Sequence, residues 1–168
     1  MGAKWEKAQR PDHPVLDDEA WEALPLLRHL HGIAVEQLGT SGTGNHFVEW
    51  GTLHLDLPDA GLGLAAGDYL ALLSHSGSRG VGFKIANFYS KLAESLHPAL
   101  DRQARQLAWL PLASEAGAEY WLSMTLAGKF AAANHQIIHQ RVAGAVGLQA
   151  LAVVENHHNF AWRAVLPD

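Results

Sequence analysis

The sequence predicts an α+β fold in which long helices pack against a mixed or antiparallel sheet. Strand-like alternation runs through residues 46–57, a mostly apolar run covers 68–76, and 114–146 is a long segment with helical periodicity. These segments lack the regular strand-helix-strand order of a parallel α/β sheet, which favours α+β. With 168 residues the chain is long enough for its own core, and we treat 1–168 as one domain with 1–20 as a lead-in.

Helices are expected at four places along the chain. A short helix follows the acidic residues 17–19, and a second covers about 25–37. Residues 81–96 carry apolar side chains at helical spacing, and Pro98 limits that helix. The periodic segment 114–146 forms one long helix or two.

Strands are expected to end where histidines stand. The first begins at His46, and Gly51 within it suggests a bulge or a hairpin. The apolar run 68–76 reads as a central strand that delivers His75 at its C-terminal end. Residues 148–160 are apolar and β-branched, so a further strand is expected there, again with histidine at its end.

Composition and charge exclude several classes of protein. No apolar run approaches the roughly 18 residues of a membrane span, and the N-terminus lacks the apolar core of a signal peptide, so a cytoplasmic protein is expected. A net charge of −5 argues against a generally basic nucleic-acid binder. Because the chain has no cysteine, a metal would need imidazole or oxygen ligands, and the 11 histidines point to metal or phosphate chemistry.

Three short strings place histidine beside small polar residues and glycine. They are LGTSGTGNHFVEW at 38–50, LLSHSGSRGVG at 72–82 and ENHHNFAW at 155–162. Each resembles a signature stretch of the RtcB family, and the three occur in the order that this family uses. RtcB proteins are manganese- and GTP-dependent RNA ligases that join a 3′-phosphate or 2′,3′-cyclic phosphate end to a 5′-hydroxyl. The resemblance implies an RtcB-like core.

The resemblance also implies a pair of manganese ions held by histidine. His75 and His158 would bind the first ion and His46 the second, and the three side chains are expected to converge at the C-terminal ends of neighbouring strands. His158 is favoured over His157, because neighbouring strand residues point to opposite faces and the family pairs histidine with a following asparagine. Zn²⁺ or Ni²⁺ would also suit such ligands, since histidine sites prefer them to manganese.

Phosphate-binding groups are expected around these histidines. Asn45 and the amides of the Gly-rich loop can bind an oxyanion, and the guanidinium of Arg79 can bind two phosphate oxygens at once. By the resemblance, Arg79 contacts RNA phosphate and Glu49 lies near the guanine nucleotide. Ser76 and Asn159 complete the predicted substrate-binding set.

Two further signatures of the family have no counterpart in the chain. One is the Asp-x-Gly-Cys-Gly stretch that supplies an aspartate and a bridging cysteine to the metals, and the other is the Ser-His-Gly-Ala-Gly-Arg-like stretch whose histidine carries the guanylate. We therefore expect a truncated RtcB-like module that does not complete ligation alone. RNA ends are the expected ligand, and another chain could supply the missing segments. The alternative is an inactive metal- or phosphate-binding fragment, or a self-associating structural one, that forms a homo-oligomer.

A separate pair, His135 and His139, stands four residues apart and so shares one face of the predicted helix. Such a pair can bind zinc, but no glutamate follows His135 as it does in HExxH helices. We expect both side chains to face solvent.

Overall fold

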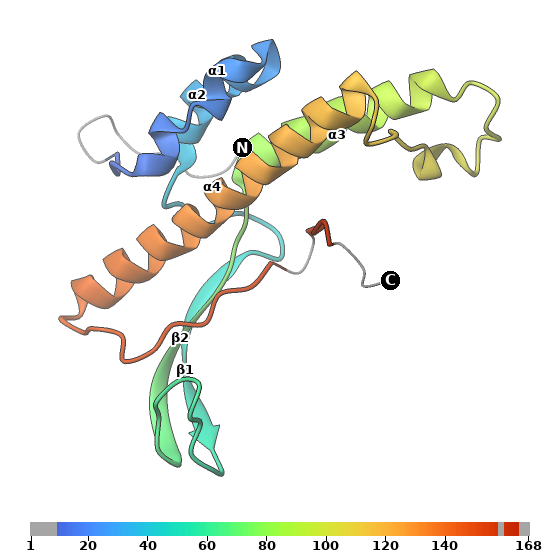
Figure 1. The fold of residues 1–168 in the computed structure, drawn as a ribbon. Helices are drawn as coiled ribbons and strands as arrows, with labels where there is room; N and C mark the ends of the chain where they lie inside the picture. Colours follow the sequence, from blue (N-terminus) through green and yellow to red (C-terminus); the bar gives the residue numbers. More distant parts are fainter. Residues whose placement is uncertain (1–9, 158–159, 165–168) are drawn as a thin grey trace.

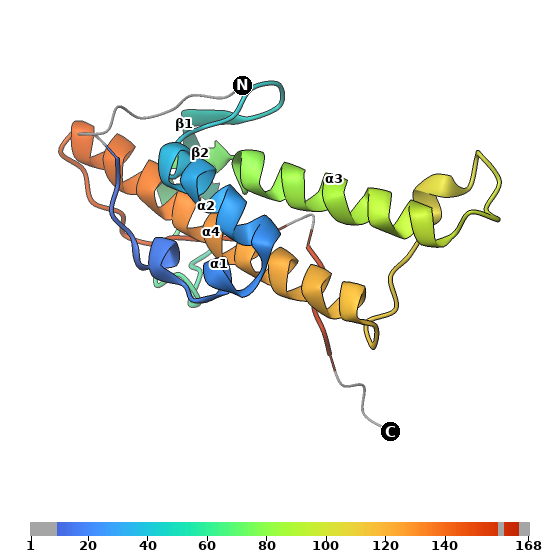
Figure 2. The same cartoon turned by 90° about the horizontal axis from the view of Figure 1, so that it is seen from above.

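The computed structural model describes residues 10–157 and 160–164, and it confirms the α+β fold. Figures 1 and 2 show a layer of helices from which a long β-hairpin projects. None of the helices in the described part of the chain is both long and apolar enough to cross a membrane.

The N-terminal layer consists of short elements and one longer helix. A 3-10 helix, η2 (Pro14–Asp17), precedes α1 (Ala20–Ala23), and α2 (Pro25–Gln37) follows. Pro25 occupies the first position of α2, where a missing N–H costs nothing. The bounds of α2 confirm the helix expected at about 25–37.

Two long helices form the rest of the layer. α3 (Arg79–Leu96) begins two residues earlier than expected, and α4 (Glu115–Ala145) is one continuous helix. The Ser114 side chain accepts a hydrogen bond from the Gly117 amide at 3.1 Å and so caps α4. A short 3-10 helix, η3 (Arg105–Leu107), lies in the connection between α3 and α4.

The strands β1 (Phe47–Leu55) and β2 (Gly67–His75) form an antiparallel hairpin. Phe47 pairs with His75 and Leu55 with Gly67, so the register is continuous and Gly51 forms no bulge. In the described residues this is a two-stranded sheet, and the expectation of a central strand at 68–76 is wrong. β2 has only β1 as its partner there.

The expected strand at 148–160 is also wrong over the residues that the structure describes. Residues 148–157 have no strand assignment, and Val153 and Val154 are 65% and 70% exposed. The physical reason is that β-branched residues form a strand only where a neighbouring strand can pair with them, and no such pairing is formed by the described part of this segment. Figure 1 shows it returning from the end of α4 toward the middle of the molecule.

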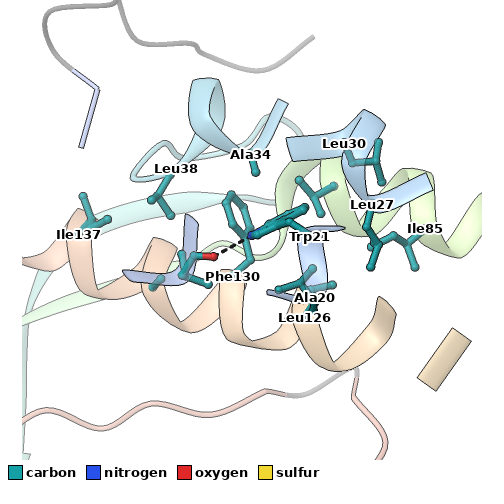
Figure 3. Close-up of a cluster of buried hydrophobic side chains, with 14 of the residues drawn as sticks. Ala20, Trp21, Leu27, Leu30, Ala34, Leu38, Ile85, Leu126, Phe130 and Ile137 are labelled. Carbon is teal, nitrogen blue, oxygen red and sulfur yellow. Dashed lines mark hydrogen bonds between the residues drawn. The ribbon is translucent and has the colours of Figure 1, made fainter. Parts of the chain in front are cut away.

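The core lies between the helices. Trp21, Leu30 and Phe130 are almost fully buried, and the Trp21 and Phe130 rings meet edge to face with centroids 6.4 Å apart. Figure 3 shows these side chains with Ile85 from α3 and Leu126 from α4. The indole N–H of Trp21 donates to the Val15 carbonyl oxygen at 2.8 Å, shown as the dashed line, so its one polar group is satisfied inside the core. This core fixes α2, α3 and α4 relative to one another.

Candidate metal and phosphate site

His46 and His75 come together where the hairpin joins the helical layer. Their ring centroids are 6.0 Å apart and the ring planes meet at 83°. His75 is the last residue of β2, and His46 comes directly before β1. Because the strands are antiparallel and Phe47 pairs with His75, these two positions lie side by side. The two histidines thus meet at the end of one strand and the start of the other, not at two C-terminal strand ends as expected.

The ring of His46 is held in one tautomer by the Gly-rich loop. Its Nδ1 lies 2.9 Å from the Thr43 carbonyl oxygen, which can only accept, so Nδ1 is the donor and, in the neutral ring, Nε2 carries the lone pair. A backbone carbonyl on the far nitrogen is the usual way to orient a metal-binding imidazole. Gly42 makes this possible, because a Cβ there would collide with the His46 ring and with Nη1 of Arg79.

Arg79 lies beside this pair in a strained conformation. Its φ of 56° is the sole positive value among the described non-glycine residues, and such strain is typical of functional sites. Its Nε donates to Oγ1 of Thr40 at 3.2 Å, and the next amide, of Gly80, donates to Oε1 of Gln37 at 2.9 Å. Burial lowers the pKa of Arg79 from its ordinary value, because the charged guanidinium has lost water.

The other predicted substrate-binding residues are spread around the pair. Ser76 follows His75 and is half-buried, and its Oγ accepts a hydrogen bond from Nδ2 of Asn134 at 3.1 Å. Asn45 is exposed on the Gly-rich loop next to His46. Glu49 is exposed on β1 opposite Leu73, on the same face of the hairpin as Phe47 and His75.

The third predicted metal ligand, His158, lies outside the described residues, as does Asn159. The neighbouring His157 is described, and its ring packs near Phe160 with centroids 5.4 Å apart. Between residues 10 and 157 and in 160–164, no set of three His, Cys, Asp or Glu side chains is arranged to hold a metal ion.

The spacing of the two imidazoles is compatible with a divalent cation between them. Imidazole nitrogen binds such ions at about 2.0–2.1 Å, so rings whose centroids are 6.0 Å apart can reach a common ion or two adjacent ones. Two of the three predicted metal ligands thus lie close together in the described part of the chain.

Comparison with known proteins identifies the family. Residues 21–165 match the family model described as tRNA-splicing ligase RtcB. The chain belongs to the RtcB family. It is 36% identical over 107 residues to the tRNA-splicing ligase RtcB of Nanoarchaeum equitans, a match that covers 61% of this chain and 22% of that protein. It is 31% identical over 137 residues to the RNA-splicing ligase RtcB of Mycobacterium bovis, covering 74% of this chain and 31% of that protein. The chain thus spans less than a third of the length of these RtcB relatives.

Sequence reasoning missed one residue at the centre of this RtcB segment. Asn134 of α4 is fully buried and bonds to both of the loops that carry the predicted ligands. It stands in an apolar helix, AAANHQII, with no motif spacing to mark it. A lone buried asparagine in a run of alanines is the one signal that could have found it.

The expectation that His135 and His139 face solvent is wrong. The His135 side chain is only 13% exposed and its Nδ1 lies 3.4 Å from Oε1 of Glu155, while Nε2 of His139 lies 2.7 Å from Oγ of Ser74 in β2. The reason is that the C-terminal segment and the hairpin cover this face of α4. The pair joins three parts of the fold instead of lying on a solvated helix face.

Burial of His139 predicts a stability that depends on pH. Its pKa is lowered from the ordinary value of 6.5, first by burial and then by the charge of nearby His135, so the unfolded chain binds the proton more tightly. This contribution to stability is complete above about pH 6.5 and is lost as the pH falls from there toward the folded pKa. Urea unfolding between pH 7.5 and 5.5 should show a steeper loss for the wild type than for His139→Gln. Equal slopes would contradict it.

Proposed function

We propose that this chain supplies the histidine-rich part of a metal-dependent RNA ligase centre. The reaction would be the joining of an RNA 3′-phosphate or 2′,3′-cyclic phosphate to a 5′-hydroxyl, with GTP and Mn²⁺ as cofactors. The observation that supports it is the convergence of His46, at the end of the Gly-rich loop, with His75 and Arg79, on either side of residues 76–78, in a chain that belongs to the RtcB family. The two RtcB relatives described above are named as RNA-splicing or tRNA-splicing ligases.

His46 and His75 would hold manganese, and His158 is proposed as the third protein ligand. When bound, such an ion supplies Lewis-acid stabilisation of charge on phosphoryl oxygens. The Thr43 carbonyl oxygen accepts from Nδ1 of His46, so Nε2 would be the nitrogen that binds the ion. Zn²⁺ or Ni²⁺ would compete for these ligands on intrinsic affinity.

Arg79 is proposed to bind the terminal phosphate of the RNA. The guanidinium lies beside His46 across Gly42, so one phosphate can contact both the cation and a metal on the imidazole. Asn45, Ser76 and Asn159 would add polar contacts. Glu49 would lie toward the guanine nucleotide, two residue pairs along the hairpin from His75.

Ligation would need groups that this chain does not contain, since it has no cysteine and no Ser-His-Gly-Ala-Gly-Arg-like stretch. We propose that a further polypeptide segment supplies them, in cis or from a partner, and that the assembled protein acts in the cytoplasm. By itself the chain would bind metal and phosphate without joining RNA.

Replacing Arg79 by Ala tests the phosphate site. In the presence of Mn²⁺, the variant should bind a short RNA with a 3′-phosphate roughly 1–3 kcal/mol more weakly than the wild type, because a charge-assisted contact is lost. Fluorescence anisotropy of a labelled oligonucleotide measures this. Arg105→Ala removes the same charge from exposed η3 and should leave the affinity unchanged. Equal affinity in the wild type and in Arg79→Ala would remove Arg79 from the site.

Self-association is the second candidate function, and the exposed apolar side chains favour it. Leu70 on the hairpin is 66% exposed, and Leu151 on the C-terminal segment is 79% exposed. Apolar surface of this kind promotes contact with a second chain, and a symmetric dimer or larger closed oligomer is expected. A monomeric mass by light scattering at micromolar concentration would contradict it.

A further inference from the structure

Asn134 lies at the junction of the two loops that carry His46, His75 and Arg79. Its Oδ1 accepts hydrogen bonds from the amides of Gly39 at 2.7 Å and Thr40 at 3.1 Å. Its Nδ2 donates to the Thr40 carbonyl oxygen at 3.2 Å, to Oγ of Ser76 at 3.1 Å and to the Gly77 carbonyl oxygen at 3.3 Å. One carboxamide thus joins the start of the Gly-rich loop to the loop between β2 and α3.

Only an amide can make this set of contacts. The two loop amides need an acceptor, and the Thr40 and Gly77 carbonyl oxygens need a donor, which a carboxylate lacks and an apolar side chain cannot offer. Burying an asparagine completely, in a helix position where its intrinsic propensity is poor, costs free energy that these bonds offset. A well-packed apolar residue would serve the core equally well, so the choice of asparagine points to the loops.

The contacts of Asn134 are at the base of each loop, where they control how the tips meet. The Gly-rich loop runs from Gly39 to His46, and residues 76–78 connect His75 to Arg79. Gln37 forms a separate clamp, because its Oε1 accepts from the Gly80 amide at the start of α3. If the bond from Asn134 to one loop is lost, that loop can shift relative to the other while Gly80 stays in place.

We propose that Asn134 is a positioning residue that sets the distance between the two ligand-bearing loops. It would touch neither metal nor RNA, and it would act by holding His46 and His75 close enough to share a binding site. This inference rests on the proposed function for its consequence in metal binding, but the loop geometry that it asserts can be measured without metal.

The experiment compares the wild type with Asn134→Ala, Asn134→Asp and the control Ser123→Ala. Ser123 is equally buried on α4, but it lies 11 residues away, about three helical turns. Its hydroxyl donates to the Glu119 carbonyl oxygen and lies near the Tyr89 hydroxyl. It therefore reports the effect of losing a buried polar group from the same helix without touching the loops.

Three measurements are made on each protein. Amide hydrogen exchange at Gly39 and Thr40 should speed up by about tenfold or more in Asn134→Ala, with Gly80 unchanged because Gln37 still holds it. The NOE between the His46 and His75 rings should disappear. Mn²⁺ affinity should fall by about 10–100-fold, the range for residues that orient metal ligands. Ser123→Ala should keep wild-type values in all three once global stability is taken into account.

Asn134→Asp separates the two halves of the contact. Its carboxylate still accepts from Gly39 and Thr40, so their protection should survive, while the NOE between the rings should weaken because a carboxylate cannot donate to the Gly77 carbonyl oxygen. This variant also decides the matter if Asn134→Ala does not fold. An unchanged NOE in the folded variants would overturn the proposal. Absence of Mn²⁺ binding by the wild type would overturn the proposed function alone, since the exchange and NOE data would still test Asn134.

Discussion

Trp21→Ala should lower the free energy of unfolding by about 3–5 kcal/mol, the range for removing a large aromatic side chain from a core. Trp21 is 1% exposed, and its ring packs against Phe130 and against His31 at a centroid distance of 5.3 Å. The substitution leaves a cavity between α1, α2 and α4 and also leaves the Val15 carbonyl oxygen without its indole donor. Urea unfolding followed by far-UV circular dichroism measures the loss.

Two further variants separate the causes of this effect. Trp21→Phe keeps most of the ring and loses the hydrogen bond, so a smaller loss is expected. Trp109→Ala removes a tryptophan that is 55% exposed and should cost under about 1 kcal/mol. If Trp21→Ala and Trp109→Ala cost the same, the core does not lie between the helices as described.

His75→Ala should lower Mn²⁺ affinity by about 100-fold or more. Residues that merely orient metal ligands contribute 10–100-fold, and the loss of one of the two proposed imidazole ligands should exceed that. Isothermal titration at constant pH measures the affinity. His46→Ala should show a loss of the same order, because the ring of His46 lies close to that of His75.

His54→Ala is the matched control for this loss. His54 is on the same hairpin, but it is exposed and pairs with Asp56 and Asp68 near the far end of the strands. Removing it should leave Mn²⁺ affinity unchanged. An equal loss in His54→Ala and His75→Ala would show that the ion binds to surface histidines in general, and it would remove the support for a specific site.

The helices were predictable because each carries a local signal. Periodicity alone places α2, α3 and α4, and the capping residue Ser114 marks the start of the last. The start of α3 at Arg79 was missed, since a residue with positive φ at a helix start has no sequence signature. Periodicity leaves open whether 114–146 forms one helix or two, and the structure has one, α4, in which Gly128 makes room for the Phe160 ring.

The strands were harder, because pairing is not local. The alternation in β1 predicts a strand, but nothing in the run 68–76 tells how many neighbours it has, and an apolar β-branched segment at 148–157 remains unpaired in the described part of the chain. The convergence of His46 and His75 was predictable from the motif strings. The role of Asn134 was not predictable, since partners such as Thr40 and Ser76 are 94 and 58 positions away in the sequence and most of the atoms that it contacts are backbone atoms.

Phe130 and Asn134 stand about one helical turn apart on α4, so one helix carries both a residue buried in the core and the residue that bonds to the two loops. Unfolding the core therefore releases the loops, and the unfolded chain has no site. A ligand that binds the loops will raise the free energy of unfolding of the chain by about 2.7 kcal/mol at a concentration one hundred times its Kd, and the melting temperature will rise with it. For a chain of this size that is a shift of several degrees, at roughly 2–4 °C per kcal/mol. A thermal melt in the presence of candidate metals and nucleotides would rank them without any label or activity.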